Sequence, residues 1–375
     1  MTTPILFVHY GDEWIRGSER CQLDLLAHLD RNLFEPVVWC NSQTMAAAVR
    51  NMGIRVYQSP FRFMLTSFRP RFSTRGYLEQ IHTGLRLARE HKVRLIHCNG
   101  AGPTQWMLPV ARLRSIPIIT QLHASYLKRD RYVFGCRWAD CLVGVSAEAV
   151  NGFRSDGVAD RQIRIIHNGV DSARLENGTA DPRLHALRSP ARQIVTFTGS
   201  LIHRKGVDIL LRAFRLLYDL EPRAELLILG DGPEQRSLHT MAQNLGIAPR
   251  VHFLGACNHV GVVYRDFTDI AVHPARAEAF GLVLAEAGYF GIPAAASNVG
   301  GIPEVVLDGE TGLLCEPESP DSLAATLKVL IRNPELRRRL GRAARERILQ
   351  HFTVERMARN FAALYGQLTD SGRPS

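Results

Sequence analysis

Short apolar runs alternate with longer amphipathic stretches along most of the chain, and this alternation limits the fold more than any other feature. The runs have the length of buried strands, and the stretches between them have helical spacing. Strands that alternate with helices form parallel sheets covered by helices on both faces. Because the alternation occurs in two successive series, we predict an α/β protein with two doubly wound, Rossmann-like domains.

The first series ends near residue 166, and the second begins near residue 194. In the first series we expect strands at 5–8, 36–39, 93–97, 116–121, 141–145 and 163–166, and helices at 19–29, 45–52, 78–90 and 105–113. In the second we expect strands at 194–198, 225–229, 251–253, 270–272 and 294–296, and helices at 207–217, 234–245 and 282–289. Further helices are expected at 321–330, 335–350 and 354–368.

The stretch between the two series has the composition of a linker. Residues 171–190 are polar, lack a clear apolar period and include Gly178, Pro182 and Pro190. We therefore expect one domain at 1–175 and another at 190–350. Ligands of doubly wound sheets bind beyond the carboxyl ends of the strands, so two such domains facing each other across a cleft would suit a two-substrate transfer enzyme.

Composition indicates a globular protein of the cytoplasm. No apolar run approaches the roughly 20 residues that cross a bilayer, and the chain enters its first expected strand at Ile5 without the features of a signal peptide. The 7 cysteines form no Cys-x-x-Cys pair. Their scatter argues for reduced thiols and against a zinc site or a disulfide framework.

The net charge of +10 is concentrated in the first half of the chain. Residues 1–171 hold 22 Lys and Arg against 14 Asp and Glu, which is +8 and leaves +2 for the remainder. No acidic residue occurs between Glu35 and Glu79, a stretch that also contains many aromatic residues. Two interpretations stay open: a solvated loop with a few core aromatics, or a surface that binds an anionic membrane at its inner face through Arg62, Arg69, Arg71 and Arg75.

Two glutamates, Glu278 and Glu286, lie on either side of a Phe-Gly step that precedes an expected helix. A helix N-terminus presents free N–H groups and a partial positive charge, which suit a phosphate. The two carboxylates then flank that anion site. Such an arrangement can hold a sugar at one end and a ribose at the other.

Other polar loops follow expected strands. The loop 198–206 contains Arg204 and Lys205 and can bind phosphate through charge and backbone N–H groups, although Lys205 taken alone is more typical of a surface lysine. His123 follows the strand at 116–121, where a structural role and a hydrogen bond to a ligand are both open. The stretch 229–233 is more typical of a tight turn than of a dinucleotide site, because the third glycine is missing.

Glycines mark two further loops. Gly17 and Ser18 open the first helix, where Ser18 either caps the helix or helps to present N–H groups to a phosphate. Gly300 and Gly301 follow a strand, where they permit close approach of a ligand or form a plain strand-to-helix turn. No metal-ligand spacing stands out, so we expect no dedicated metal site.

Together and in this order, the segments resemble the retaining glycosyltransferase family 4, which has the GT-B fold. The resemblance runs nearly end to end, and the order and spacing of the segments are more specific than any single motif. The segments that carry it lie at 17–20, 95–99, 120–123, 139–146, 165–171, 199–206, 229–233, 278–286, 300–304 and 308–312.

The family transfers a sugar from a nucleotide diphosphate sugar with retained anomeric configuration and without a metal or other cofactor. By resemblance, Glu286 would hold the ribose hydroxyls, Glu278 the donor-sugar hydroxyls and Lys205 the diphosphate. His123 would lie near the donor sugar and the leaving phosphate, while Gly17 and its loop would close on the phosphates. Backbone N–H groups of three residues would face the sugar and the diphosphate: Phe280, Gly281 and Leu282.

The resemblance carries further expectations. The helix at about 352–370 would pack back on the first domain, which would bind the acceptor, and the base would contact the backbone near 251–255. No carboxylate is placed as a nucleophile, so retention is expected through same-face attack assisted by the leaving phosphate. The leading hypothesis is a transferase that extends a lipid-linked or polysaccharide acceptor of the cell envelope.

Three positions depart from the family pattern. Ser200 stands where arginine is usual, so one diphosphate cation is missing, and our hypothesis is that Arg204 compensates for it. Arg16 replaces a glycine before Glu19, and Ala279 replaces a glycine after Glu278, where a methyl group would narrow the sugar pocket or change the backbone angle.

Other functions remain as alternatives. Within enzymes, the alternative is a transferase for a small soluble acceptor. The changes at Ser200 and Ala279 motivate a non-catalytic nucleotide-sugar-binding protein. A dinucleotide oxidoreductase ranks lower because no complete Gly-x-Gly-x-x-Gly motif occurs, and no recognition motif supports nucleic-acid binding.

Overall fold

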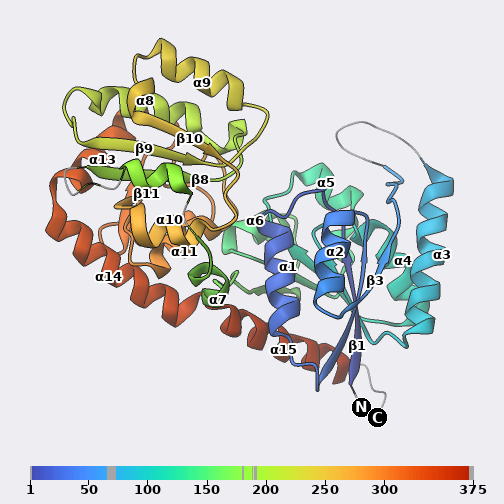
Figure 1. Cartoon of the computed structure of the whole chain (residues 1–375). Coiled ribbons are helices and arrows are strands. Elements are labelled where there is room, and N and C mark those ends of the chain that lie inside the picture. Colours follow the sequence, from blue (N-terminus) through green and yellow to red (C-terminus); the bar gives the residue numbers. More distant parts are fainter. Residues whose placement is uncertain (1, 66–72, 180, 188, 190–191, 371–375) are drawn as a thin grey trace. The chain divides into compact units, whose positions relative to one another are not determined.

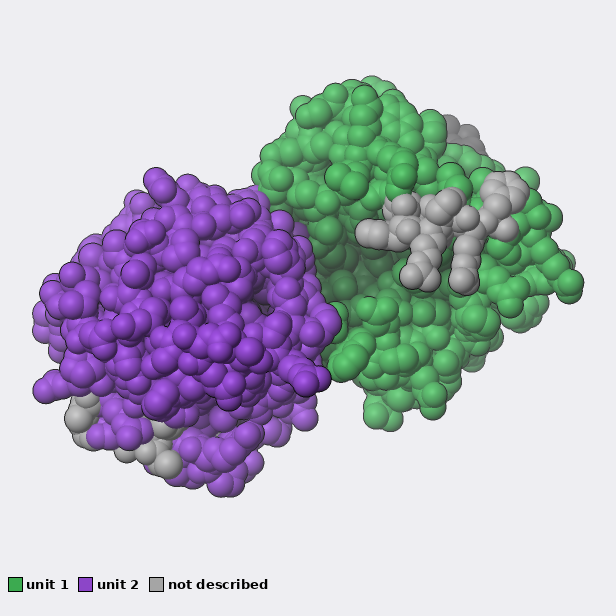
Figure 2. Space-filling model, turned by 90° about the horizontal axis from the view of Figure 1, so that it is seen from above, with its two compact units in different colours: residues 1–169, 354–375 green, residues 170–353 purple. Residues whose placement is uncertain are grey.

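The computed structural model describes residues 2–65, 73–179, 181–187, 189 and 192–370. Two arginines of the expected membrane surface, Arg69 and Arg71, and Pro190 of the expected linker lie outside these residues. The chain forms two compact units (Figures 1 and 2). Unit 1 comprises residues 1–169 and 354–375, and unit 2 comprises residues 170–353.

Unit 1 is built on a parallel sheet with the strand order β3-β2-β1-β4-β5-β6-β7. Its strands are β1 (Thr3–His9), β2 (Phe34–Cys40), β3 (Arg55–Gln58), β4 (Leu95–Asn99), β5 (Ile118–Leu122), β6 (Cys141–Gly144) and β7 (Ile163–Ile165). Its helices are α1 (Gly17–His28), α2 (Gln43–Asn51), α3 (Thr74–Glu90), α4 (Thr104–Arg114), α5 (Lys128–Val133), α6 (Ala147–Ser155) and α15 (Val354–Asp370).

Unit 2 is built on a second parallel sheet with the strand order β10-β9-β8-β11-β12-β13. Its strands are β8 (Gln193–Thr198), β9 (Ala224–Leu229), β10 (Val251–Gly255), β11 (Ile270–His273), β12 (Ala294–Ser297) and β13 (Gly312–Cys315). Its helices are α7 (Ser172–Glu176), α8 (Val207–Tyr218), α9 (Gln235–Asn244), α10 (Val260–Phe267), α11 (Leu282–Tyr289), α12 (Ile302–Val305), α13 (Pro320–Arg332) and α14 (Pro334–His351).

The prediction of an α/β protein with two doubly wound sheets is confirmed, and every expected strand is present. The sequence missed mainly short or half-exposed elements. Strand β3 lies at the edge of its sheet with two of its residues exposed, so it lacks the apolar run of a buried strand. Helix α7 has only 5 residues and lies within the stretch expected to be a linker.

Helix α15 ends the described chain but packs on unit 1, where it lies beside α1 (Figure 1). It also contacts β4. Phe361 and Tyr365 are buried against His97 of β4, with ring centroids 5.3 and 5.8 Å from the histidine ring. His97 Nε2 lies 3.0 Å from Gln121 Oε1, and Nδ1 lies 2.7 Å from the Tyr365 hydroxyl. The amide oxygen can only accept, so Nε2 donates to it and Nδ1 accepts from Tyr365.

Part of the basic, aromatic segment near residue 62 belongs to the core of unit 1. Phe61 packs on Trp39 and Trp106, and Phe63 packs on Tyr10 and Trp106, with centroids 4.8 to 5.5 Å apart. For these two aromatic side chains, packing on the core of unit 1 is therefore the correct interpretation. No helix among the described residues is long and apolar enough to span a membrane.

The contact between α15 and β4 yields a first prediction. Changing Tyr365 to Phe keeps the ring but leaves His97 Nδ1 as a buried acceptor without its donor, which should lower the stability of unit 1 by about 1–3 kcal/mol. The change in melting temperature by calorimetry measures this loss. Tyr132→Phe on α5 is the matched control, because Tyr132 is exposed and water can replace its contacts. Equal melting temperatures for Tyr365→Phe and the unmodified protein would contradict the assignment.

Candidate functional site

The order of strands in unit 2 reverses between β8 and β11, which are neighbours in the sheet but not in the sequence. The loops that follow such a pair diverge and leave room for a ligand at the carboxyl ends of the strands. Here they are the loops 199–206 and 274–281. They contain Arg204, Lys205 and Glu278, all predicted as site residues.

Lys205 and Glu278 form an ion pair between these two loops. His273, the last residue of β11, contacts the same carboxylate oxygen, with its Nε2 3.0 Å from Glu278 Oε2. The side chain of His273 is fully buried and stacks on Phe197, with an interplanar angle of 8°. Glu278 thus has two basic neighbours, Lys205 from the loop 199–206 and His273 from the end of β11.

Burial and charge together fix the protonation of this cluster. Burial alone would raise the pKa of Glu278, but the charge of Lys205 and the hydrogen bond from His273 hold it well below the usual range. Burial and the charge of Lys205 lower the pKa of His273. An ionised carboxylate can only accept, so the neutral imidazole carries its hydrogen on Nε2, and among the described residues nothing bonds to Nδ1.

Two glycines allow the loops of this site to touch. Gly206 has a φ of +69°, and a side chain there would overlap the carbonyl oxygen of Pro274. A side chain at Gly300 would overlap the carbonyl oxygen of Glu278, which also accepts from the Gly301 N–H at 2.9 Å. At Gly300 it is therefore the backbone of Glu278 that comes close.

Arg204 and Arg276 also connect the two loops. The Arg204 side chain donates to the carbonyl oxygen of Ala277 at 2.9 Å and is exposed. Arg276 donates to the carbonyl oxygen of His203 at 2.8 Å, and also to both carboxylate oxygens of Asp208 on α8 at 2.8 and 2.9 Å. Ser200 carries no charge, so the cations of this loop are Arg204 and Lys205, next to His203.

Helix α11 begins at Leu282, immediately after the glutamate loop, as predicted. Gly281 is its N-cap residue with a φ of +93°, Phe280 is buried, and the first N–H groups of the helix have no intrahelical acceptor. Ala279, in contrast, is not among the described non-glycine residues with positive φ, so the methyl group at this position requires no left-handed backbone.

Glu286 lies in the second turn of α11 and is buried. Its Oε1 accepts from Arg174 Nη2 at 2.7 Å, an ion pair in which the side chains are 7% and 25% exposed. Arg174 belongs to α7, within the stretch expected to be a linker. Both predicted glutamates of this segment are therefore held by basic side chains.

In unit 1 the strand order reverses between β1 and β4, and polar residues end both strands. His9 ends β1 and Asn99 ends β4, and both are buried. The Asn99 amide donates to His9 Nδ1 at 2.8 Å, and its oxygen accepts from His123 Nε2 at 2.7 Å. His9 Nε2 in turn lies 3.2 Å from Glu19 Oε1. His123 is thus part of a polar chain at the carboxyl edge of the sheet.

The charges of this chain follow from its burial. Burial and the neighbouring His9 lower the pKa of His123 to about 4, so the ring is neutral near pH 7. Burial alone would raise the pKa of Glu19, but the contact with His9 outweighs it and lowers the pKa to about 2. Glu19 also accepts from the Arg16 N–H and from Ser18 Oγ, each at 3.1 Å.

Gly17 is the first residue of α1, and of the two alternatives for Ser18 the helix cap is wrong. Arg16 is the N-cap residue, and the side chain of Glu19 reaches back to its N–H. Ser18 bonds to Glu19 instead, because it lies within the first turn. A side chain at Gly17 would meet nothing within 4 Å. Packing within unit 1 therefore does not require a glycine at this position.

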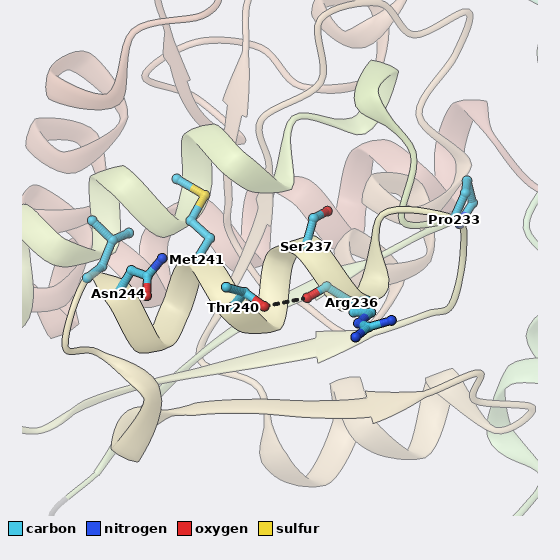
Figure 3. Close-up of a pocket in the computed structure, with 7 residues that line it drawn as sticks. Pro233, Arg236, Ser237, Thr240, Met241 and Asn244 are labelled. Carbon is cyan, nitrogen blue, oxygen red and sulfur yellow. Dashed lines mark hydrogen bonds between the residues drawn. The ribbon is translucent and has the colours of Figure 1, made fainter.

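A separate, open hollow lies along α9 and has no overlap with the loops above (Figure 3). One helix supplies nearly all of its lining, and Thr240 Oγ1 donates to the Arg236 carbonyl oxygen at 3.2 Å rather than into the hollow. Its lining residues are Pro233, Arg236, Ser237, Thr240, Met241, Asn244 and Leu245. None of the predicted site residues lies there.

Sequence reasoning missed four residues of these clusters. His9 and Asn99 are polar residues directly after buried apolar runs, and this signal could have identified them. His273 ends a strand in the same way. Arg174 gave no such signal, because it lies 112 residues from its partner in a stretch without apolar period.

The low pKa of Glu19 yields a second prediction, on pH dependence. The ordinary pKa of the carboxyl is 4.5 and the folded value is about 2, so Glu19 stabilises the fold above pH 4.5 and loses this contribution as the pH falls towards 2. The full contribution is on the order of 3 kcal/mol. Glu19→Gln should therefore lower the melting temperature most near neutral pH.

Calorimetry of the two proteins between about pH 7 and pH 3 tests this. The difference in melting temperature should shrink as the pH falls. Glu79→Gln is the matched control, because Glu79 pairs with Arg75 on the surface, with its side chain 57% exposed. A difference between Glu19→Gln and the unmodified protein that stays constant over this range would contradict the prediction.

Comparisons with known proteins agree with this architecture. The model of the family "Glycosyl transferases group 1" matches residues 186–347, and that of "Glycosyltransferase Family 4" matches residues 15–174. Glycogen synthase of Mycobacterium tuberculosis is 29% identical over 310 residues, which cover 76% of this chain and 72% of that protein.

Two more proteins extend the comparison. N-acetyl-alpha-D-glucosaminyl L-malate synthase of Bacillus anthracis is 29% identical over 259 residues, which cover 67% of this chain and 68% of that protein. The solved structure of Anabaena HepE in complex with UDP and glucose has a TM-score of 0.83 at 21% identity, covering 97% of this chain and all of that one. The chain therefore belongs to the family 4 type of glycosyltransferases and has the GT-B fold.

Proposed function

We propose that the protein transfers a sugar, with retained configuration and without a metal, from a nucleotide diphosphate sugar to a lipid-linked or polysaccharide acceptor. The observation that carries the proposal is the cluster of Lys205, Glu278 and His273 at the strand reversal of unit 2. HepE was solved in complex with UDP and glucose, which supports a uridine nucleotide among the candidate donors.

The donor would bind along the loops that follow β8 and β11. Lys205 and the N-terminus of α11, at Phe280, Gly281 and Leu282, would face the diphosphate, where a cation and free N–H groups stabilise negative charge. Glu286, further along the same helix, would accept the ribose hydroxyls. Gly17 would approach the phosphates from unit 1.

The state of Glu278 supports its role as a hydrogen-bond acceptor. Its pKa lies well below the usual range, and a carboxylate that is already bonded to Lys205 and His273 is a weak base and a weak nucleophile. It would therefore bind sugar hydroxyls and would not attack the anomeric carbon.

Retention then follows from attack on the same face of the sugar. The bond between the anomeric carbon and the β-phosphate oxygen breaks, and its electron pair stays on that oxygen. The acceptor hydroxyl oxygen forms the new bond to the same carbon, and its proton passes to the phosphate oxygen. Lys205 would stabilise the charge that develops on the leaving diphosphate.

His123 would contact the sugar from unit 1. Its Nε2 hydrogen is donated to Asn99, and the ring is neutral near pH 7, so Nδ1 can accept a hydrogen bond. An acceptor at this position suits a sugar hydroxyl better than a phosphate oxygen. This favours a positioning role next to the donor sugar.

The acceptor class has two candidates. Two relatives at the same identity have names that point to different products: glycogen synthase to a polymer, and N-acetyl-alpha-D-glucosaminyl L-malate synthase to a small molecule. The basic charge of the first half favours an acceptor at an anionic membrane surface. Turnover with a soluble acceptor in the absence of lipid would support the small-molecule alternative.

The donor proposal predicts a selective thermal shift. One of the uridine, guanosine and adenosine diphosphate sugars should raise the melting temperature, because a ligand at about 100 times its Kd stabilises the fold by about 2.7 kcal/mol. Lys205→Met should weaken binding of that donor by roughly tenfold or more, since it removes a charged partner of the diphosphate. The measurement is a melting curve at increasing donor concentration.

Two variants accompany this experiment. Lys328→Met on α13 is the matched control and should leave binding unchanged. Arg204→Ala should also weaken binding if Arg204 supplies the cation that is missing at Ser200, and full affinity would refute that hypothesis. Absence of any shift with all three donors, or an unchanged affinity in Lys205→Met, would refute the donor site. If the protein binds the donor but shows neither sugar transfer nor slow hydrolysis of the donor, it is a non-catalytic binding protein.

The membrane proposal predicts salt-sensitive binding to vesicles. The protein should sediment with vesicles that contain anionic phosphatidylglycerol and should be released by added salt or by neutral lipid, because screening weakens attraction between exposed charges. Removing charge from the basic segment should also reduce vesicle binding. The variant for this test replaces four arginines together by glutamine: Arg62, Arg69, Arg71 and Arg75.

The control removes charge from a basic helix of unit 2. The combined glutamine variant of Arg338, Arg339 and Arg342 on α14 should bind anionic vesicles as the unmodified protein does. Vesicle binding that is insensitive to salt and to lipid charge would refute the electrostatic proposal.

A further inference from the structure

Arg174 contacts the glutamate that the proposed function assigns to the ribose, although it lies in a stretch whose sequence predicts only a linker. Its Nη2 is 2.7 Å from Glu286 Oε1. The carboxylate side chain is 7% exposed. A charge as buried as this is unfavourable unless a partner compensates it, and Arg174 is that partner.

The position of Arg174 is set by the short helix α7. Asp171 is the N-cap residue, and its side chain accepts from the Arg174 N–H at 3.2 Å. Leu175, the next residue, is buried, and its carbonyl oxygen occupies the space that a side chain at Gly261 of α10 would need. The backbone next to Arg174 is therefore packed closely against α10.

A second contact joins α7 to the helix that carries Glu286. The hydroxyl of Tyr289 donates to a carboxylate oxygen of Glu176. Glu286 and Tyr289 are three residues apart and lie on one face of α11, while Arg174 and Glu176 flank Leu175 on α7. Two side-chain contacts thus hold α7 and α11 together and place the guanidinium on Glu286.

We infer that Arg174 is a positioning residue that sets the specificity of this site for a ribonucleotide. This inference rests on the proposed function, which assigns Glu286 to the ribose. A carboxylate can accept about four hydrogen bonds, so the one from Arg174 leaves capacity for two vicinal hydroxyls. By holding Oε1, Arg174 fixes the carboxylate plane and keeps the acceptor oriented before the nucleotide arrives, which favours binding through pre-organisation.

The experiment compares the nucleoside diphosphate that binds best among UDP, GDP and ADP with its 2′-deoxy form. Calorimetric titration gives the ratio of the two Kd values for each protein. The unmodified protein should favour the ribonucleotide by about tenfold or more, because the deoxy form leaves a charged acceptor without its donor. Arg174→Met should reduce this ratio severalfold, whereas a merely structural loss would weaken both ligands equally.

Three further variants complete the test. Arg174→Gln keeps a neutral donor and should give an intermediate ratio, which also provides a second variant if Arg174→Met does not fold. The double variant Arg174→Met with Glu286→Gln should have the same ratio as Glu286→Gln alone, because both substitutions act through the carboxylate of residue 286. Arg338→Met, which removes a surface partner of Glu335, is the matched control and should keep the full ratio.

The possible results separate the two proposals. Failure of the unmodified protein to bind any of the three nucleoside diphosphates would refute the proposed function. If the unmodified protein binds ribo and deoxy forms with the same affinity, the assignment of Glu286 to the ribose is refuted together with the inference. An unchanged ratio in a folded Arg174→Met or Arg174→Gln variant would refute the inference about Arg174 alone. A reduced ratio in both variants, absent from the Arg338→Met control, supports it.

Discussion

Parallel pairing of the strands is the constraint on which both candidate sites depend. Since all strands of a sheet point the same way, their carboxyl ends lie along one edge, and a reversal of strand order opens the loops at that edge. In unit 2 the reversal brings together the loops that carry Lys205 and Glu278. In unit 1 it brings His9 beside Asn99. Residues at or just beyond the strand ends therefore form the centre of each candidate site.

The fold could be predicted because burial on both faces makes central strands apolar throughout. The strand at 270–272 matches β11 closely for this reason. Strand β3 escaped prediction because an edge strand needs no continuous apolar run. Helix α7 escaped because its 5 residues are too few for a helical period, and contacts with distant residues hold it in place.

The site could be predicted only in part, because sequence motifs identify loops but not the partners that hold them. The spacing around Glu278 and Glu286 pointed to an anion site between two acids. It gave no sign that His273 would contact the first acid or that Arg174 would contact the second. A histidine at the end of an apolar strand resembles a core residue, and an arginine in a polar stretch resembles a surface residue. Only the folded chain brings them to the carboxylates.

These partners have a consequence for the order of events in the proposed reaction. Without a ligand, Lys205 pairs with Glu278, and a diphosphate would compete for the same cation. Glu278 would then keep only the neutral His273, and a buried carboxylate with a single neutral donor is poorly compensated. Donor-sugar hydroxyls would supply the missing hydrogen bonds, whereas a nucleoside diphosphate without its sugar would not. The same cluster would therefore bind the intact donor more favourably than the nucleotide product and so assist product release.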